Sequence, residues 1–150
     1  MDWLGQLGLG LPLGLAAIGS ALGVGAAGQA AAGAWAREAR EGKGLNFKYI
    51  ILTGMPLTQL FYGFILMLIA LKGNVYGDAV SANAGALLSI GLGCGLGELF
   101  SAWMQGVIGA SAIRAMADSE GKPFVFSIIA MGIAETVGLF SFVLMLLMRP

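Results

Sequence analysis

Three polar side chains interrupt apolar stretches that are otherwise long enough to cross a lipid bilayer. Glu135 is the only charged residue between positions 123 and 148, and Gln59 and Gln105 also lie in apolar surroundings. Carboxylates inside membrane-spanning segments are costly and usually functional. Because no lysine or arginine of the chain reaches that level, we expect Glu135 to bind a proton or a cation, or to meet a positive charge on another protein.

A second polar group surrounds Pro56. Four residues have the i, i+3, i+4, i+7 spacing that places side chains on one helical face: Met55, Thr58, Gln59 and Tyr62. Pro56 has no backbone N–H, so the carbonyl of Leu52 should lose its partner and the helix should kink there. Loosened carbonyl oxygens beside a hydroxyl and an amide are plausible ligands for a hard cation.

Counting residues places the three intramembrane polar side chains at one depth. Three polar connectors join the apolar stretches: residues 36–48, 72–83 and 117–123. Gln59 lies 13 residues after Asn46 of the first connector, Gln105 lies 13 residues before Asp118 of the third, and Glu135 lies 12 residues after Pro123. At a rise of about 1.5 Å per residue, all three lie roughly 18–20 Å from the connectors. We therefore expect one site built from three helices, although the two glutamines could instead only hydrogen-bond the helices together.

The elements that must position these residues are membrane helices. The chain has 150 residues, of which 58% are hydrophobic and 11% charged, with zero net charge and no histidine. Soluble domains are nearer a quarter charged, so this composition indicates a membrane protein and gives no case for nucleic-acid binding. Four apolar segments exceed the length of about 20 residues that a spanning helix needs: 9–36, 49–71, 79–113 and 123–148.

The two halves of the chain repeat one pattern. Nine of the 25 glycines fall between Gly5 and Gly33 and seven between Gly85 and Gly109. We therefore expect an all-α membrane protein with two tandem helical hairpins, residues 1–75 and residues 76–150. Four GxxxG pairs should allow close helix approach in the inner layer of a ring: Gly10/Gly14, Gly19/Gly23, Gly91/Gly95 and Gly93/Gly97.

Basic residues predict the orientation. Six of the eight flank the first and third connectors: Arg37, Arg40, Lys43, Lys48, Arg114 and Lys122. By the positive-inside rule, the two hairpin loops are cytoplasmic and both termini lie outside. The N-terminus carries an acidic residue and no clear cleavage site, so we expect it to be the retained start of the first span. The lone cysteine, Cys94, is expected to be a packing residue.

The segments "PLTQLFYGF", "FSAWMQG" and "AETVGLFSF" together resemble the proteolipid of V-type ATPases. The chain is similar, from about Gly14 to Met148, to the K (c-type) subunit of prokaryotic sodium-translocating V/A-type enzymes. The resemblance implies a sodium site formed by five groups: the Met55 backbone carbonyl, Thr58, Gln59, Gln105 and Glu135. It also implies that Tyr62 hydrogen-bonds the glutamate in a locked state.

This resemblance implies an ion-carrying rotor in the plasma membrane. Copies of the chain would form a ring in contact with lipid, a static membrane subunit of the a/I type that carries an arginine, and the central-stalk subunits. Each protomer would carry one Na⁺, or alternatively H⁺. The chain would not be an enzyme by itself, with no catalytic residues, since it has no G-x-x-x-x-G-K-[ST] phosphate-binding motif.

Two other functions fit part of the sequence. A small four-helix, proton-coupled multidrug transporter would explain four spans and one membrane glutamate, but not the hairpin duplication. A purely structural pore-forming proteolipid would leave Glu135 without a role.

Glu98 departs from the family pattern, in which small residues are expected at this position. It lies seven residues before Gln105, and therefore on the same helical face. Three roles are open: pairing with Lys72, facing the interior of the ring, or forming an accessory carboxylate near the ion path.

Overall fold

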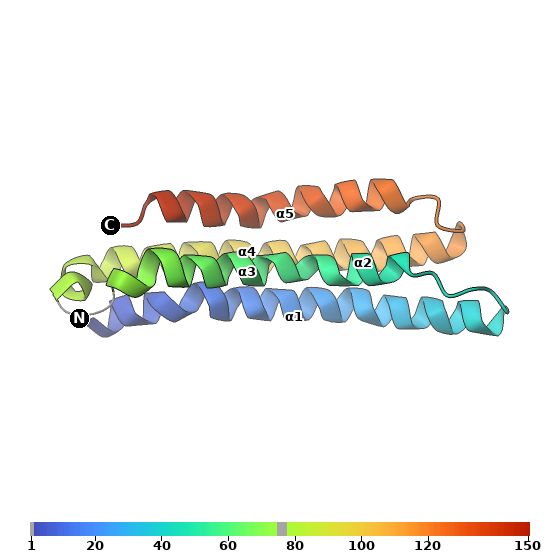
Figure 1. Cartoon of the computed structure of the whole chain (residues 1–150), viewed down its shortest axis with the longest axis horizontal. Helices are drawn as coiled ribbons and strands as arrows, with labels where there is room; N and C mark the ends of the chain where they lie inside the picture. The colour runs from blue at the N-terminus through green and yellow to red at the C-terminus, as the bar shows by residue number, and fades with distance from the viewer. Residues whose placement is uncertain (1, 75–77) are drawn as a thin grey trace.

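The computed structural model describes residues 2–74 and 78–150, and within those ranges it contains helices and no strands (Figure 1). The first, third and fourth spans are α1 (Asp2–Arg40), α4 (Asp78–Asp118) and α5 (Phe124–Leu147). The second span is divided into α2 (Lys48–Gly54), the 3-10 helix η1 (Met55–Leu57), α3 (Thr58–Ile65), the π-helix η2 (Leu66–Leu71) and the 3-10 helix η3 (Lys72–Asn74).

Four helical segments of the described chain are long and apolar enough to cross a membrane: Asp2–Arg40, Lys48–Asn74, Asp78–Asp118 and Phe124–Leu147. The prediction of an all-α protein with four spans is confirmed. α1 and α4 are longer than the predicted spans 9–36 and 79–113, because the helices continue through the polar residues at their ends. The predicted boundary between residues 75 and 76 lies outside the described residues.

Glycines bring the first and third spans together. α4 packs against α1 and also against α5 (Figure 1). A Cβ atom at Gly106 would overlap the backbone of Gly23, and one at Gly91 would overlap the backbone of α1. Small residues permit such close approach between membrane helices. The predicted pairs Gly19/Gly23 and Gly91/Gly95 both lie in this α1–α4 contact.

The other two glycine pairs do not lie in that contact. An added Cβ at Gly10 or Gly14 would meet no atom within 4 Å, so both residues lie on an open face of α1. A Cβ at Gly93 would lie 3.0 Å from the side chain of Met145 on α5. These two pairs therefore lie outside the α1–α4 contact, because a GxxxG spacing does not tell which side of its helix faces a neighbour.

Pro56 interrupts the second span where the sequence predicts a kink. α2 ends at Gly54, the backbone tightens into the 3-10 turn η1, and a regular α-helix resumes at Thr58. The missing N–H of proline explains the break. The π-helical turn of η2, two turns further on, has no such signal in the sequence.

Two apolar clusters form the core. One lies toward the first and third connectors, and the other lies toward the second connector and the chain termini. The first includes Leu52, Ile113, Met116 and Met131. The second includes Leu66, Leu71, Leu87, Ile90 and Cys94. Along α4 the residues between these clusters include three buried polar side chains, so a polar layer separates the two halves of the core.

Candidate functional site

The polar layer is built from the second, third and fourth spans. Gln59 on α3 and Gln105 on α4 have no exposed surface, and Ser101 on α4 is 3% exposed. Glu135 on α5 is only half-buried, so it lies at the surface of the four-helix unit. The residues predicted from their depth to form one site do lie together.

Hydrogen bonds link this layer into a continuous chain that ends on one carboxylate. The Gln59 amide nitrogen donates to Oε1 of Gln105 at 3.2 Å, and the Gln105 amide nitrogen donates to Oε2 of Glu135 at 3.2 Å. The hydroxyl of Tyr62 donates to the other carboxylate oxygen, Oε1, at 3.3 Å. Both oxygens of Glu135 therefore accept hydrogen bonds.

Three oxygen atoms lie close together at the start of this chain of hydrogen bonds, because of the turn at Pro56. The Thr58 hydroxyl lies 3.1 Å from the Met55 carbonyl oxygen and 3.0 Å from Oε1 of Gln59. A hydroxyl has one hydrogen, so it can donate to only one of these acceptors at a time. The remaining oxygen lone pairs are available to a cation.

Aromatic contact fixes the orientation of Tyr62. Its ring stacks on that of Phe142 from α5, with centroids 5.6 Å apart and planes inclined by 18°. The stack and the hydrogen bond both join α3 to α5. Tyr62 is therefore held beside Glu135 by packing as well as by its hydroxyl.

Ser101 belongs to the same layer and was missed by the sequence analysis. Its hydroxyl accepts a hydrogen bond from the Gln59 amide nitrogen at 3.1 Å and donates to the Ala134 carbonyl at 2.9 Å. The available signal was its position four residues before Gln105, on the same helical face. That signal is weak, since serine in a helix commonly bonds a carbonyl of its own preceding turn.

Glu98 lies inside the four-helix unit, with none of its surface exposed. Neither of its carboxylate oxygens has a hydrogen-bond partner among the described residues. Lys72 is exposed and makes no ion pair with it. Of the three roles left open for Glu98, the pairing with Lys72 is therefore not observed, and the carboxylate points into the protein interior.

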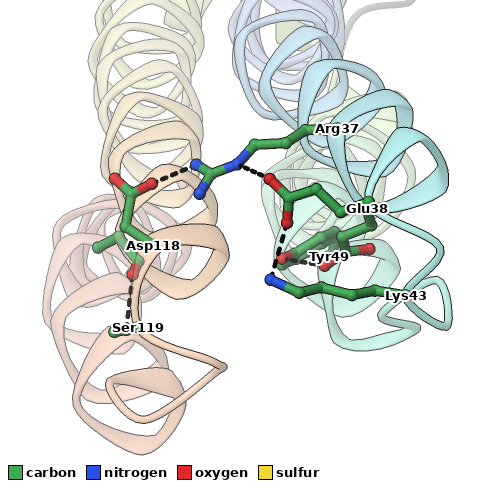
Figure 2. Close-up of polar contacts among 8 residues, drawn as sticks. Arg37, Glu38, Lys43, Tyr49, Asp118 and Ser119 are labelled. Atoms are coloured by element: carbon green, nitrogen blue, oxygen red, sulfur yellow. Dashed lines mark hydrogen bonds and ion pairs between the residues drawn. The ribbon is translucent and has the colours of Figure 1, made fainter.

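Polar contacts tie the spans together at the connector end. The Arg37 guanidinium of α1 forms an ion pair with Asp118 of α4 (Figure 2). Glu38 is also nearly buried, and it accepts hydrogen bonds from the Tyr49 hydroxyl at 2.7 Å and from the Asn46 backbone N–H at 2.9 Å. These contacts hold the first connector against the start of α2.

Ionic contacts also act within the first connector. Lys43 donates to Glu41 at 2.7 Å and Arg37 donates to it at 2.9 Å. Chiefly through the hydrogen bond from Lys43, and then that from Arg37, the pKa of Glu41 is lowered from its ordinary value of 4.5 to about 2. The carboxylate is therefore ionised at all physiological pH values.

Comparison with known protein families places both halves of the chain in a family. Residues 7–70 and 88–148 match the family of the ATP synthase C subunit. The two matched segments coincide with the two hairpins, α1 to η2 and α4 to α5. No curated protein matches the chain.

Proposed function

Because the chain belongs to the family of the ATP synthase C subunit, we propose that it is the ion-carrying rotor subunit of a prokaryotic V-type ATPase, with Glu135 holding one sodium ion per protomer. Members of this family are non-catalytic membrane proteolipids that form homo-oligomeric rings with an a subunit and a central stalk. A multidrug transporter or a purely structural pore does not agree with this membership. The V-type assignment, the identity of the ion and the residues that bind it are the parts that we propose.

One observation carries the assignment of the site. A chain of hydrogen bonds from Thr58 through Gln59 and Gln105 ends on the carboxylate of Glu135, in a layer enclosed by apolar core on both sides. A carboxylate in a membrane protein needs a compensating charge. Since no lysine or arginine of the described chain pairs with Glu135, a bound ion supplies it.

The oxygen inventory favours sodium over a proton. Five groups on three spans supply candidate oxygens, namely the Met55 carbonyl, Thr58, Gln59, Gln105 and Glu135. Hard cations take about six or more oxygen ligands, with waters completing the set, whereas a proton needs only one acceptor. For sodium to use Gln105, its amide must turn so that the oxygen, rather than the nitrogen, faces Glu135. A proton at Glu135 remains the second candidate, since the same hydrogen bonds could stabilise a carboxyl group.

The duplicated hairpin supports the V-type assignment. The second span carries Gln59 at the layer where the fourth span carries Glu135, so four helices provide one carrier carboxylate at the protein surface. One ion per four helices lowers the number of ions moved per ATP, which suits pumping against a steep gradient. The basic residues of the first and third connectors favour a plasma-membrane orientation with the two hairpin loops in the cytoplasm and both termini outside.

The site residues have separate roles in the rotor cycle. With its ion bound, the half-buried Glu135 is neutral and can face lipid. Tyr62 holds the carboxylate in this loaded position through the hydrogen bond to Oε1. Opposite an arginine on the static a/I-type subunit, the carboxylate can give up its ion and remain charged. Ions that enter and leave by separate routes there couple transport to rotation.

Carbodiimide labelling tests the site directly, because the reagent attacks a protonated carboxyl group. Membranes containing the intact complex are labelled over a range of pH, with and without sodium, and Glu135 is identified by peptide mass spectrometry. Protection by sodium at constant pH supports the sodium site, whereas labelling governed by pH alone makes the rotor proton-carrying. Absence of labelling at Glu135 under every condition would overturn the site.

A further inference from the structure

Glu98 is a second membrane-embedded carboxylate that the proposed sodium site does not use. It is fully buried, and both of its oxygens lack a hydrogen-bond partner. Among the described residues, only the Ser20 hydroxyl is another buried side-chain oxygen in this condition. Burying an ionised carboxylate without a partner costs several kcal/mol or more. Glu98 must therefore be neutralised.

The carboxylate occupies a space made by a glycine of the neighbouring helix. A Cβ atom at Gly138 of α5 would lie 2.5 Å from Oε2 of Glu98 and 3.0 Å from the Ser101 hydroxyl. Gly138 follows Glu135 by three residues, or about one helical turn. Glu98 thus points at α5 one turn beyond the carrier carboxylate, toward the C-terminal end of that helix.

No cation of the described chain is available to neutralise it. The titratable side chains that act on Glu98 electrostatically, or that it acts on, are Cys94 of its own helix, Tyr62 of α3 and Glu135 of α5. None of these is basic. A negative charge on Glu98 would also repel the charge that Glu135 must carry when its ion leaves.

The surroundings suit a proton and not a metal cation. Ser101, whose hydroxyl also faces Gly138, already donates its hydrogen to the Ala134 carbonyl. The Ser101 oxygen also accepts from the Gln59 amide, so one lone pair remains able to accept, whereas sodium would need several further oxygens around Glu98. Complete burial also separates Glu98 from the partly exposed surface at which Glu135 can exchange its ion.

We propose that Glu98 is a resident proton-binding carboxyl group that keeps its proton while Glu135 exchanges ions. Each protomer then has two membrane carboxylates but transports one ion. The inference rests on the proposed rotor function and adds a second bound species, a proton, inside each protomer. Its neutral state keeps the second charge away from the carrier site.

Infrared absorption of protonated carboxyl groups tests the resident proton in the purified ring. The buffer contains saturating sodium, and pH is varied from mildly acidic to alkaline. We expect one pH-insensitive protonated carboxyl band per protomer in the wild type, its loss in Glu98→Gln, and its retention in Glu135→Gln. A band that is absent in both wild type and Glu135→Gln, or that titrates near neutral pH, would overturn the proposal.

Transport stoichiometry in the complete enzyme separates this proposal from the proposed function. In reconstituted vesicles, Glu98→Gln should move the same number of sodium ions per ATP as the wild type, so that the variant-to-wild-type ratio of this number is about one. A twofold decrease would show that Glu98 carries a transported sodium ion and would overturn the proposal. Continued transport by Glu135→Gln would instead overturn the carrier role of Glu135, while the infrared band would still report on Glu98. Should Glu98→Gln fail to assemble, the Glu135→Gln spectrum alone decides, because Glu98 is unaltered in it.

Discussion

The Gln105 amide nitrogen of α4 bonds two groups of α5 at once: Oε2 of Glu135 at 3.2 Å and the Met131 carbonyl at 3.1 Å. Both amide hydrogens are therefore used between these helices. If Gln105 turns to present its oxygen to sodium, both bonds must break. Ion binding and the local α4–α5 contact are consequently linked at this side chain.

Replacing Gln105 by leucine should weaken sodium binding. A hydrogen bond or ligand to a charged group contributes about 1.5–3 kcal/mol, which corresponds to roughly a tenfold to hundredfold change in affinity. The sodium concentration that half-protects Glu135 from carbodiimide should rise by that factor. Gln29→Leu, at an exposed glutamine of α1, is the matched control and should leave it unchanged; an unchanged value for Gln105→Leu would remove this residue from the site.

Tyr62→Phe should produce a smaller effect. The substitution removes one hydrogen bond to Glu135 and keeps the aromatic stack on Phe142. A loss of about 1 kcal/mol is expected, so half-protection should require about fivefold more sodium. Tyr49→Phe removes a hydroxyl that binds Glu38 at the connector end and should not change sodium protection. Equal effects of the two substitutions would contradict the role assigned to Tyr62.

Glu135→Gln should abolish ATP-driven sodium transport while leaving the ring assembled. Glutamine keeps the size of the side chain and an oxygen acceptor, but it lacks the charge that balances the ion. Sodium uptake into vesicles should fall to the background level, and the ring should retain its size by gel filtration. Loss of the ring itself would mean that the substitution reports on folding, and Glu135→Asp would then be compared under the same conditions.

Gly106→Ala should destabilise the α1–α4 contact. The added methyl group would overlap the backbone of Gly23, and overpacking of this kind costs about 1–3 kcal/mol. The thermal midpoint of helix unfolding in detergent should fall. Gly85→Ala in the same helix, where an added Cβ meets no atom within 4 Å, is the control. A midpoint equally lowered in both variants would attribute the effect to something other than this contact.

The first connector should respond to acid at unusually low pH. The folded-state pKa of Glu41 is lowered to about 2, chiefly by the hydrogen bond from Lys43. Its stabilising contacts are therefore complete above the ordinary value of 4.5 and are lost as pH falls toward 2. NMR titration of the Glu41 carboxyl measures this directly. In Lys43→Gln the pKa should move back toward 4.5, and an unchanged value would exclude Lys43 as the main cause.

The sequence predicted how deep in the membrane the polar side chains lie better than it predicted which neighbours they face. Counting residues brought Gln59, Gln105 and Glu135 to one layer, and Pro56 predicted the break in the second span. The sequence could not predict the rotational orientation of each helix, that is, which of its sides faces which neighbour, because residues on every side of a membrane helix are apolar or small. For this reason the participation of Ser101, the burial of Glu98 and the open positions of Gly10 and Gly14 became visible only in the structure.

The length of α1 and α4 has a mechanical consequence. They contain 39 and 41 residues, so at about 1.5 Å per residue each is roughly 60 Å long, twice the thickness of the hydrocarbon core. The pair is packed through glycines and tied near one end by Arg37 and Asp118. Two such rods side by side resist bending and torsion better than either alone. Torque applied at the first and third connectors should therefore reach the ion layer through these two helices with little elastic lag.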